Sequence, residues 1–269
     1  MPKAGVIGWP VKHSKSPIIY RYWLEKNNIR GHYTDIEISP DDFQKCIFQL
    51  ADDGFVGVNV TIPYKESAIA MADKKTSRAS SIGAANMLIF RGGGIIAENT
   101  DAEGFIRNLR ASAPDWNPAR GMVLVLGAGG AARAIIYALV ESGASQIFIA
   151  NRTQFRAKNL AAEFQLSLIS WDDINQATAE ASMVVNTTSL GMAGQPPLDI
   201  ELNCPSDALV TDIVYTPVET PLLAQAKAKG LATVDGLGML LHQAVPGFEA
   251  WFGTRPAVTP ALREKVLSA

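Results

Sequence analysis

The chain has 269 residues, enough for two domains of ordinary size that each bury a hydrophobic core. Hydrophobic residues make up 48% of the sequence and charged residues 19%, which is typical of a globular protein and excludes a disordered one. Lys and Arg (24) nearly balance Asp and Glu (26), so no basic surface indicates a nucleic-acid or membrane partner. We therefore expect a small-molecule partner.

Cysteine and histidine usage argues against two further kinds of site. The two cysteines, Cys46 and Cys204, and the three histidines are scattered along the chain without the spacing of metal ligands. We expect neither a disulfide framework nor a metal site. No apolar run is long enough to span a bilayer, and no signal-peptide pattern precedes the first strand. A cytoplasmic location is the expectation, and a monomer and a homodimer both stay open.

The first hundred residues predict an α/β unit. Residues 4–8 form a short strand, and a loop with Ser14 and Ser16 follows before Pro17 starts a helix. Two hydroxyls beside two lysines at a helix N-terminus suit a small carboxylate, although capping of the helix by one serine is an alternative. Further elements are expected at 33–38 (strand), 40–52 (helix), 57–63 (strand), 82–90 (turn and strand), 95–97 (strand) and 102–111 (helix).

A polar cluster is expected where the strand over residues 57–63 ends. Alternation places Asn59 and Thr61 on one face of this strand, and Lys65 follows just past its end. Ligands bind at the carboxyl ends of strands in α/β sheets, so these side chains are candidate ligand contacts. A solvated loop lysine is the alternative for Lys65. Asp101 closes a later polar run, where the alternative role is a helix N-cap.

Residues 123–133 organise the second half of the chain. Four apolar residues, 123–126, predict a buried strand, and glycines at 127, 129 and 130 separate it from an alanine-rich helix that runs to Val140. A second strand over residues 146–150 completes a βαβ unit. This context favours a dinucleotide-binding turn, in which the helix N-terminus faces a pyrophosphate, over an ordinary tight turn.

The end of the second strand indicates which dinucleotide binds. NAD sites usually carry Asp or Glu there, whereas this chain has Asn151, Arg152 and Thr153, with Arg156 one helical turn further on. A guanidinium group binds a 2′-phosphate, which a carboxylate would repel. The sequence therefore predicts NADP(H), the alternative being two solvated arginines at an exposed helix N-terminus.

The remaining elements continue a doubly wound pattern. They are expected at 155–164 (helix), 167–170 (strand), 171–176 (helix), 183–187 (strand), 209–215 (strand), 231–234 (strand), 240–251 (helix) and 260–267 (helix). Pro217 and Pro221 are expected to start a further helix that runs through Ala228. No strand follows residue 234, so we expect the closing helices to return to the first domain. The prediction is an α/β protein with an N-terminal α/β substrate domain (1–100), a Rossmann-like doubly wound NADP-binding domain (101–237) and C-terminal helices (238–269).

Seven stretches, taken together, resemble the shikimate dehydrogenase family, whose NADP-dependent members interconvert 3-dehydroshikimate and shikimate. They are HSKSP (13–17), NVTIPYKE (59–66), GAAN (83–86), NTD (99–101), GAGGA (127–131), NRT (151–153) and DGLGM (235–239), in family order over nearly the whole chain. The resemblance implies an oxidoreductase of the shikimate pathway, which leads to chorismate and the aromatic amino acids.

The resemblance also implies a role for each matching residue. Lys65 and Asp101 would be the catalytic pair, with Lys65 as acid and base. Substrate carboxylate contacts would be Ser14, Ser16 and Tyr215, and contacts to the ring hydroxyls would be Thr61, Asn86 and Gln243. NADP contacts would be Gly127, Ala128, Gly129, Gly130 and Ala131 for the pyrophosphate, Asn151, Arg152, Thr153 and Arg156 for the adenosine phosphate, and Ile213 and Gly236 for the nicotinamide. The chain departs from the usual family pattern at Met87, usually Thr, and at Ser77, an acid in many members.

Two other functions stay open. A paralogue that oxidises quinate or a related hydroxy acid, and that also accepts NAD, would share most of these motifs. A non-catalytic NADP sensor would keep the fold without turnover, but it would have no need for both Lys65 and Asp101. Nicotinamide absorbance with shikimate or quinate as substrate separates the three.

Overall fold

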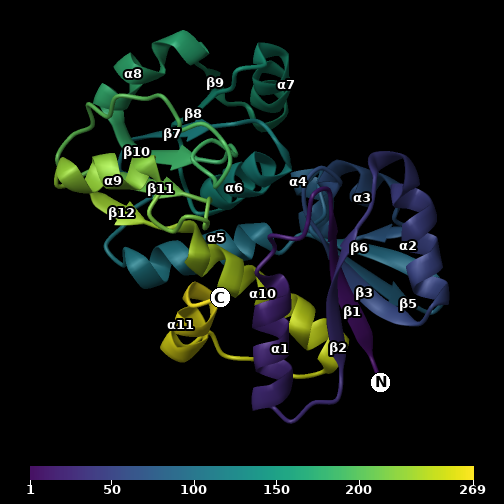
Figure 1. Cartoon of the computed structure of the whole chain (residues 1–269). Coiled ribbons are helices and arrows are strands. Elements are labelled where there is room, and N and C mark those ends of the chain that lie inside the picture. The colour runs from purple at the N-terminus through teal and green to yellow at the C-terminus, as the bar shows by residue number, and fades with distance from the viewer. The chain divides into compact units, whose positions relative to one another are not determined.

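The computed structural model describes all 269 residues and contains two compact units (Figure 1). Unit 1 comprises Met1–Asp101 and Leu241–Ala269, and unit 2 comprises Ala102–Leu240. The chain passes from unit 1 to unit 2 at the start of α5 (Asp101–Ser112) and returns within α10 (Gly236–Phe252). Unit 1 is therefore discontinuous in sequence.

Unit 1 is built on a six-stranded mixed sheet with the order β2-β1-β3-β5-β6-β4. The strands are β1 (Lys3–Gly8), β2 (His32–Glu37), β3 (Phe55–Val60), β4 (Lys74–Lys75), β5 (Met87–Arg91) and β6 (Gly94–Glu98). β1 and β3 run parallel, whereas β5 runs antiparallel to both β3 and β6. The carboxyl ends of β1, β3 and β6 and the amino end of β5 consequently meet at one edge of the sheet.

Helices and a shared aromatic core complete unit 1. The helices are α1 (Ser16–Lys26), α2 (Phe43–Asp52), preceded by a 3-10 turn, α3 (Lys65–Met71), α4 (Ser77–Ile82), the later part of α10, and α11 (Pro260–Leu267). Tyr20 of α1 stacks on Tyr33 of β2 with 3.8 Å between ring centroids, and Phe248 of α10 packs against the Tyr20 ring. Helices α1 and α11 lie side by side (Figure 1). These contacts explain why the closing helices belong to the first unit.

Unit 2 contains a six-stranded parallel sheet with the order β12-β11-β10-β7-β8-β9. The strands are β7 (Met122–Leu126), β8 (Ile147–Ala150), β9 (Ser167–Leu168), β10 (Ala181–Asn186), β11 (Leu209–Asp212) and β12 (Ala232–Val234). This is the strand order of a Rossmann fold, in which the direction of winding changes between β7 and β10. All five residues of β7 are buried and apolar, as a central parallel strand requires.

The helices of unit 2 connect these strands in a doubly wound arrangement. They are α5, α6 (Gly130–Glu141), α7 (Gln154–Phe164), α8 (Ile174–Ala177) between two 3-10 turns, α9 (Pro221–Ala228) and the start of α10. The predicted fold class is confirmed: two α/β units, one of them Rossmann-like, with closing helices on the first. None of the helices is both long and apolar enough to cross a membrane.

Three of the predicted boundaries that differ from the structure lie at α10, β11 and β3. Helix α10 begins at Gly236 rather than Leu240, because the Asp235 carboxylate accepts a hydrogen bond from the backbone N–H of Leu237 at 3.0 Å and caps the helix. Strand β11 ends at Asp212 rather than Tyr215, because the Asp212 side chain accepts the N–H of Val214. Strand β3 ends at Val60 rather than at residue 63, and Ile62, which was expected inside the strand, is 62% exposed.

Candidate active site

The edge of the unit 1 sheet brings Lys65 and Asp101 together. Lys65 is the first residue of α3, just after β3, and Asp101 is the first residue of α5, just after β6. Their ammonium and carboxylate groups form an ion pair, and the two side chains are only 14% and 6% exposed. The predicted cluster beyond β3 thus contains a charged pair that is largely shielded from water, and shielding strengthens its electrostatic interaction.

A buried amide holds the second oxygen of Asp101. The two hydrogens of Asn86 Nδ2 are shared among three acceptors, namely Asp101 Oδ1 at 2.9 Å, Thr100 Oγ1 at 2.9 Å and Gln243 Oε1 at 3.1 Å. Asn86 Oδ1 accepts the backbone N–H of Thr100 at 2.7 Å. Gln243, on α10, is 8% exposed, and its backbone carbonyl accepts the Thr100 hydroxyl at 2.8 Å. The amides predicted as hydroxyl contacts therefore form one network with Asp101.

The serine loop lies beyond β1 at the same edge. The Ser16 N–H donates to Ser14 Oγ at 3.3 Å, and Ser16 is 4% exposed at the start of α1. The N-cap residue of this helix, Lys15, makes no side-chain capping bond, so the Ser14 hydroxyl is the side-chain acceptor at the start of α1. Thr61 follows β3, and its backbone N–H donates to the Ile7 carbonyl at 2.9 Å, which anchors it beside β1. The hydroxyls of both loops are thus brought to the edge that carries Lys65.

Asn59 serves the interior of unit 1 instead. Its side chain is 4% exposed, accepts the Tyr33 hydroxyl at 2.7 Å and donates to the Asn86 carbonyl at 3.3 Å. Alternation along β3 was read as placing Asn59 with Thr61 among the ligand contacts. In the structure, Asn59 accepts the hydroxyl hydrogen of the buried Tyr33, which explains why a polar residue stands at this buried position.

The glycine turn of unit 2 fits a pyrophosphate. Gly127 has φ +112°, and a Cβ added there would lie 2.4 Å from Thr187 Oγ1, so the close approach of β10 requires glycine. Gly129, the N-cap of α6, offers no capping side chain and has open space where a Cβ would lie. The first N–H groups of α6 therefore face an open position without a side-chain acceptor, which is the geometry that binds phosphate oxygens. Residues 128–131 are partly exposed along this turn.

The residues beyond β8 fit a 2′-phosphate. Arg152 and Arg156 are both exposed, at the start of α7, and neither forms an ion pair within the protein. Asn151 Nδ2 donates to the Thr153 carbonyl at 2.9 Å, which fixes the turn that carries Arg152. Thr153 is the N-cap of α7 and makes no side-chain capping bond. Two free guanidinium groups at a helix N-terminus form a site for a doubly charged anion.

The predicted nicotinamide contacts lie after β11 and β12. Gly236 begins α10, and a Cβ there would lie 2.3 Å from the Ile213 carbonyl oxygen, so these two backbone segments are in direct contact. Tyr215 is partly buried, and burial raises the pKa of its phenol further above its ordinary 10.0. The sequence reading missed the buried Asp212 between these elements.

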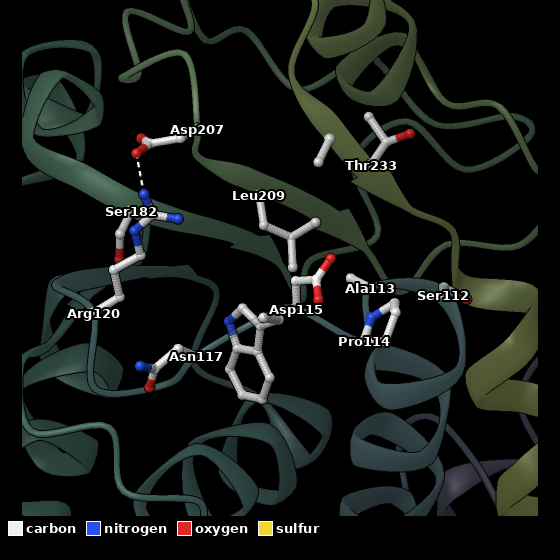
Figure 2. Close-up of a pocket in the computed structure, with 12 residues that line it drawn as sticks. Ser112, Ala113, Pro114, Asp115, Asn117, Arg120, Ser182, Asp207, Leu209 and Thr233 are labelled. Atoms are coloured by element: carbon white, nitrogen blue, oxygen red, sulfur yellow. Dashed lines mark hydrogen bonds and ion pairs between the residues drawn. The ribbon is translucent and has the colours of Figure 1, made fainter.

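A separate cavity of about 290 Å³ lies at the opposite edge of the unit 2 sheet (Figure 2). It is lined by the C-terminal end of α5 and the loop that follows, and by residues at the amino ends of strands such as Leu209 and Ala232. None of the predicted site residues lines it. Arg120 is held there in an ion pair with Asp207, and the Ser182 hydroxyl donates to the Met122 carbonyl at 3.0 Å. No group of His, Cys, Asp and Glu in the protein could hold a metal ion.

Family models match three parts of the chain: a shikimate dehydrogenase substrate binding domain at residues 6–88, a shikimate / quinate 5-dehydrogenase at 112–193, and a shikimate 5′-dehydrogenase C-terminal domain at 236–267. Among curated relatives, the shikimate dehydrogenase (NADP(+)) of Paracoccus denitrificans is 52% identical over 99% of this chain and 96% of that protein. The protein of the same name from Rhodospirillum rubrum is 50% identical over 98% and 96%.

Solved structures agree with these relatives. Shikimate 5-dehydrogenase from Thermus thermophilus, in complex with NADP(H) and shikimate, superposes with a TM-score of 0.88 at 34% identity and covers 100% of this chain and 99% of its own. Quinate dehydrogenase from Corynebacterium glutamicum, in complex with NAD, gives a TM-score of 0.91 at 30% identity and the same coverage. With half of its residues shared with curated members over their whole length, the chain belongs to the shikimate dehydrogenase family.

Proposed function

We propose that this chain catalyses the reversible NADPH-dependent reduction of 3-dehydroshikimate to shikimate, within the pathway to chorismate and the aromatic amino acids. The observation that carries the proposal is the shielded pair of Lys65 and Asp101 at the edge of the unit 1 sheet. Relatives about 50% identical over the full length, each named shikimate dehydrogenase (NADP(+)), support the same activity. Unit 1 would bind the substrate, and unit 2 would bind the cofactor.

Lys65 and Asp101 are the proposed catalytic residues. NADPH supplies a hydride when bound. Reduction of a ketone leaves negative charge on the former carbonyl oxygen, so a positioned proton donor lowers the barrier. The Lys65 ammonium has three N–H donors, of which the ion pair with Asp101 uses one. A second can be donated to the substrate oxygen, and the reverse reaction returns that proton to Lys65.

Asp101 orients this lysine and is itself held in place. One carboxylate oxygen accepts from Lys65 and the other from Asn86 at 2.9 Å. The carboxylate therefore cannot rotate without losing a buried hydrogen bond, and the ammonium stays aligned. Ser14, Ser16 and Tyr215 are proposed to bind the substrate carboxylate, and Thr61, Asn86 and Gln243 the ring hydroxyls.

The cofactor would be held by three segments of unit 2. We propose that residues 127–131 bind the pyrophosphate through backbone N–H groups, and that Asn151, Arg152, Thr153 and Arg156 bind the adenosine phosphate. Ile213 and Gly236 would contact the nicotinamide. The unpaired arginines favour NADP over NAD, because NAD carries no phosphate at the position that they would bind.

Quinate oxidation is the second candidate. The similarity to a quinate dehydrogenase in complex with NAD, with a TM-score of 0.91, favours testing it. The exposed arginines and the curated relatives named for NADP and shikimate favour the first proposal.

Absorbance of the reduced nicotinamide tests the function directly. Purified protein is mixed with shikimate and either NADP or NAD, and then with quinate in place of shikimate. Rapid reduction of NADP with shikimate is the expected result. Comparable turnover with quinate, or with NAD, would move the protein to the second candidate, and no turnover with any pair would refute both.

We also propose that the protein acts in the cytoplasm as a monomer or a homodimer. The location is supported by the likeness to biosynthetic enzymes, and no observation favours one of the two oligomeric states over the other. Cell fractionation tests the location, and light scattering of the purified protein distinguishes the monomer from the dimer.

A further inference from the structure

Asp212 is a buried carboxylate at the carboxyl edge of the unit 2 sheet. It is the last residue of β11 and is 1% exposed. Its oxygens accept hydrogen bonds from three uncharged donors: Asn186 Nδ2 at 3.0 Å, the Val214 N–H at 3.0 Å and the Thr220 hydroxyl at 2.8 Å. An acid without a cationic partner is costly to bury, and burial raises the pKa of this one. The presence of an acid at this buried position therefore needs a functional or structural explanation.

The carboxylate fixes the orientation of a second buried side chain. Asn186 ends the neighbouring strand β10 and is 0% exposed. Because Asp212 Oδ1 only accepts, it requires the NH₂ group of Asn186 on its side and turns the Asn186 oxygen away. That oxygen accepts the Thr188 N–H at 3.0 Å and the Thr188 hydroxyl at 2.8 Å. An Asn186 side chain flipped by half a turn would set oxygen against oxygen and N–H against N–H.

The bonds made by Asn186 shape the loop that follows β10. Asn186 Nδ2 also donates to the Leu190 carbonyl at 3.1 Å, and the Leu190 N–H donates to Thr188 Oγ1 at 3.1 Å. Thr188 in turn packs on the glycine turn, since a Cβ at Gly127 would lie 3.1 Å from Thr188 Cγ2. The orientation set by Asp212 thereby determines the shape of the loop after β10, which lies against Gly127.

Asp212 also shapes the loop after its own strand. Its bond to Val214 tightens the backbone at Ile213, whose carbonyl contacts Gly236. Its bond to Thr220 holds the residue that caps α9. One side chain therefore joins the segments that carry the proposed nicotinamide contacts.

We propose that Asp212 is a positioning residue that, through Asn186 and the Val214 N–H, sets the shape of the nicotinamide half of the cofactor site. This inference rests on the proposed function, in that it assumes NADP as the ligand of unit 2. The property of Asp212 that matters here is the acceptance of hydrogen bonds by its oxygens, not its negative charge. An asparagine at position 212 keeps an oxygen for Asn186 and Val214, and it turns an NH₂ group toward Thr220, whose hydroxyl can accept.

Two ligands separate a local effect from a general one. NADP⁺ has both halves of the cofactor, whereas adenosine 2′,5′-bisphosphate lacks the nicotinamide. Dissociation constants of both are measured by isothermal titration calorimetry for the unsubstituted protein, Asp212→Ala and Asp212→Asn. We expect Asp212→Ala to weaken NADP⁺ binding about tenfold and bisphosphate binding less than about threefold. Asp212→Asn should change either constant by less than about threefold. Asn186→Ala, which breaks the same link, should give the Asp212→Ala pattern and replaces it if that variant does not fold.

Thr178 provides the matched control. It is 0% exposed in the same unit, its hydroxyl donates to the Asn175 carbonyl at 2.8 Å and accepts the Asn203 N–H at 2.9 Å, and it precedes the amino end of β10. Thr178→Val should lower the unfolding temperature without changing the ratio of the two dissociation constants.

Four results would overturn the inference. Equal weakening of both ligands by Asp212→Ala, or a ratio changed as much by Thr178→Val, would reduce Asp212 to a general stability role. A tenfold loss of NADP⁺ binding in Asp212→Asn would show that charge, not hydrogen-bond acceptance, matters. Failure of the unsubstituted protein to bind NADP⁺ at all would refute both the proposed function and this inference. The other results concern the substituted proteins alone and would refute this inference while the proposed function stands.

Discussion

Replacement of Lys65 by methionine removes the ammonium group and keeps an unbranched side chain of similar reach. The proposed proton donor is then absent, while the hydrogen bond from Asn86 to Asp101 at 2.9 Å remains. The Asp101 oxygen that faced Lys65 loses its partner, and the Asp101 side chain is only 6% exposed, so water replaces the ammonium poorly. The substitution therefore affects both catalysis and folding.

The two effects have separate magnitudes. Loss of a general acid lowers kcat roughly 10²- to 10⁴-fold. That range corresponds to about 2.7–5.4 kcal/mol of activation free energy. A shielded carboxylate left without its ammonium partner lowers the free energy of unfolding by about 3–5 kcal/mol. Substrate affinity should change less than about threefold, because the proposed contacts in the serine loop and at Thr61 make no bond with Lys65.

Steady-state absorbance gives kcat and KM, and urea unfolding gives the stability change. Lys227→Met is the matched control, because the Lys227 ammonium forms an ion pair with Glu219 away from the proposed site and the two side chains are 54% and 55% exposed. An exposed pair of this kind contributes about 0–1 kcal/mol, so the control should keep its kcat. A Lys65→Met variant with an unchanged kcat and a raised KM would refute the role of proton donor.

Three further predictions follow from unit 2. Arg152→Ala should raise the KM for NADP about tenfold and leave the KM for NAD unchanged, and an equal rise in both constants would contradict a 2′-phosphate contact. Gly127→Ala should lower the free energy of unfolding by about 2–4 kcal/mol in urea, since φ is +112° and Thr187 lies in the way; Gly143→Ala, with φ +97° and open space, should lose only about 1–2 kcal/mol. Burial raises the pKa of Asp212 above its ordinary 3.8, so the folded state binds the carboxyl proton more tightly than the unfolded state does. The contribution of Asp212 to stability therefore falls as the pH rises from 3.8 through the raised pKa of the folded state. The stability of Asp212→Asn relative to the unsubstituted protein should accordingly increase with pH in a urea series, and a flat difference would count against a shifted pKa.

Elements with strong local signals were predictable from the sequence. The helix bounds predicted at residues 260–267 agree with α11, and the helix predicted to start at Pro217 and Pro221 begins at Pro221 and ends at Ala228 as α9. In both, threonine accepts a hydrogen bond from a first-turn N–H and proline follows at the first helical position. By contrast, α3, β4 and α4 between residues 65 and 82 were missed. β4 has two exposed lysines, and its pairing with β6 is a tertiary contact that leaves no local pattern.

The candidate site was predictable where strand ends carry motifs, and less so where polarity serves the interior. Lys65 and Asp101 come together because β3 and β6 end at the same edge of one sheet, as the polar residues after each strand indicated. The interior role of Asn59 could not be predicted, because its partner Tyr33 lies on β2, separated from β3 by β1, and the sequence does not reveal this strand order. The role of Asp212 was missed because the sequence does not indicate that Asn186, on the neighbouring strand, donates a hydrogen bond to it.

The same arrangement occurs at the sheet edge of both units: a buried asparagine whose orientation is fixed by a hydrogen bond to an aspartate. Asn86 donates to Asp101 and accepts the Thr100 N–H, while Asn186 donates to Asp212 and accepts the Thr188 N–H. The partners of the aspartates differ: Asp101 faces the ammonium of Lys65, whereas Asp212 faces only uncharged donors. A carboxylate paired with a lysine can govern a proton that moves to substrate, and one surrounded by amides and a hydroxyl can only fix geometry. The partner of the acid, rather than its burial or its place at a strand end, therefore distinguishes the proposed catalytic aspartate from the positioning one.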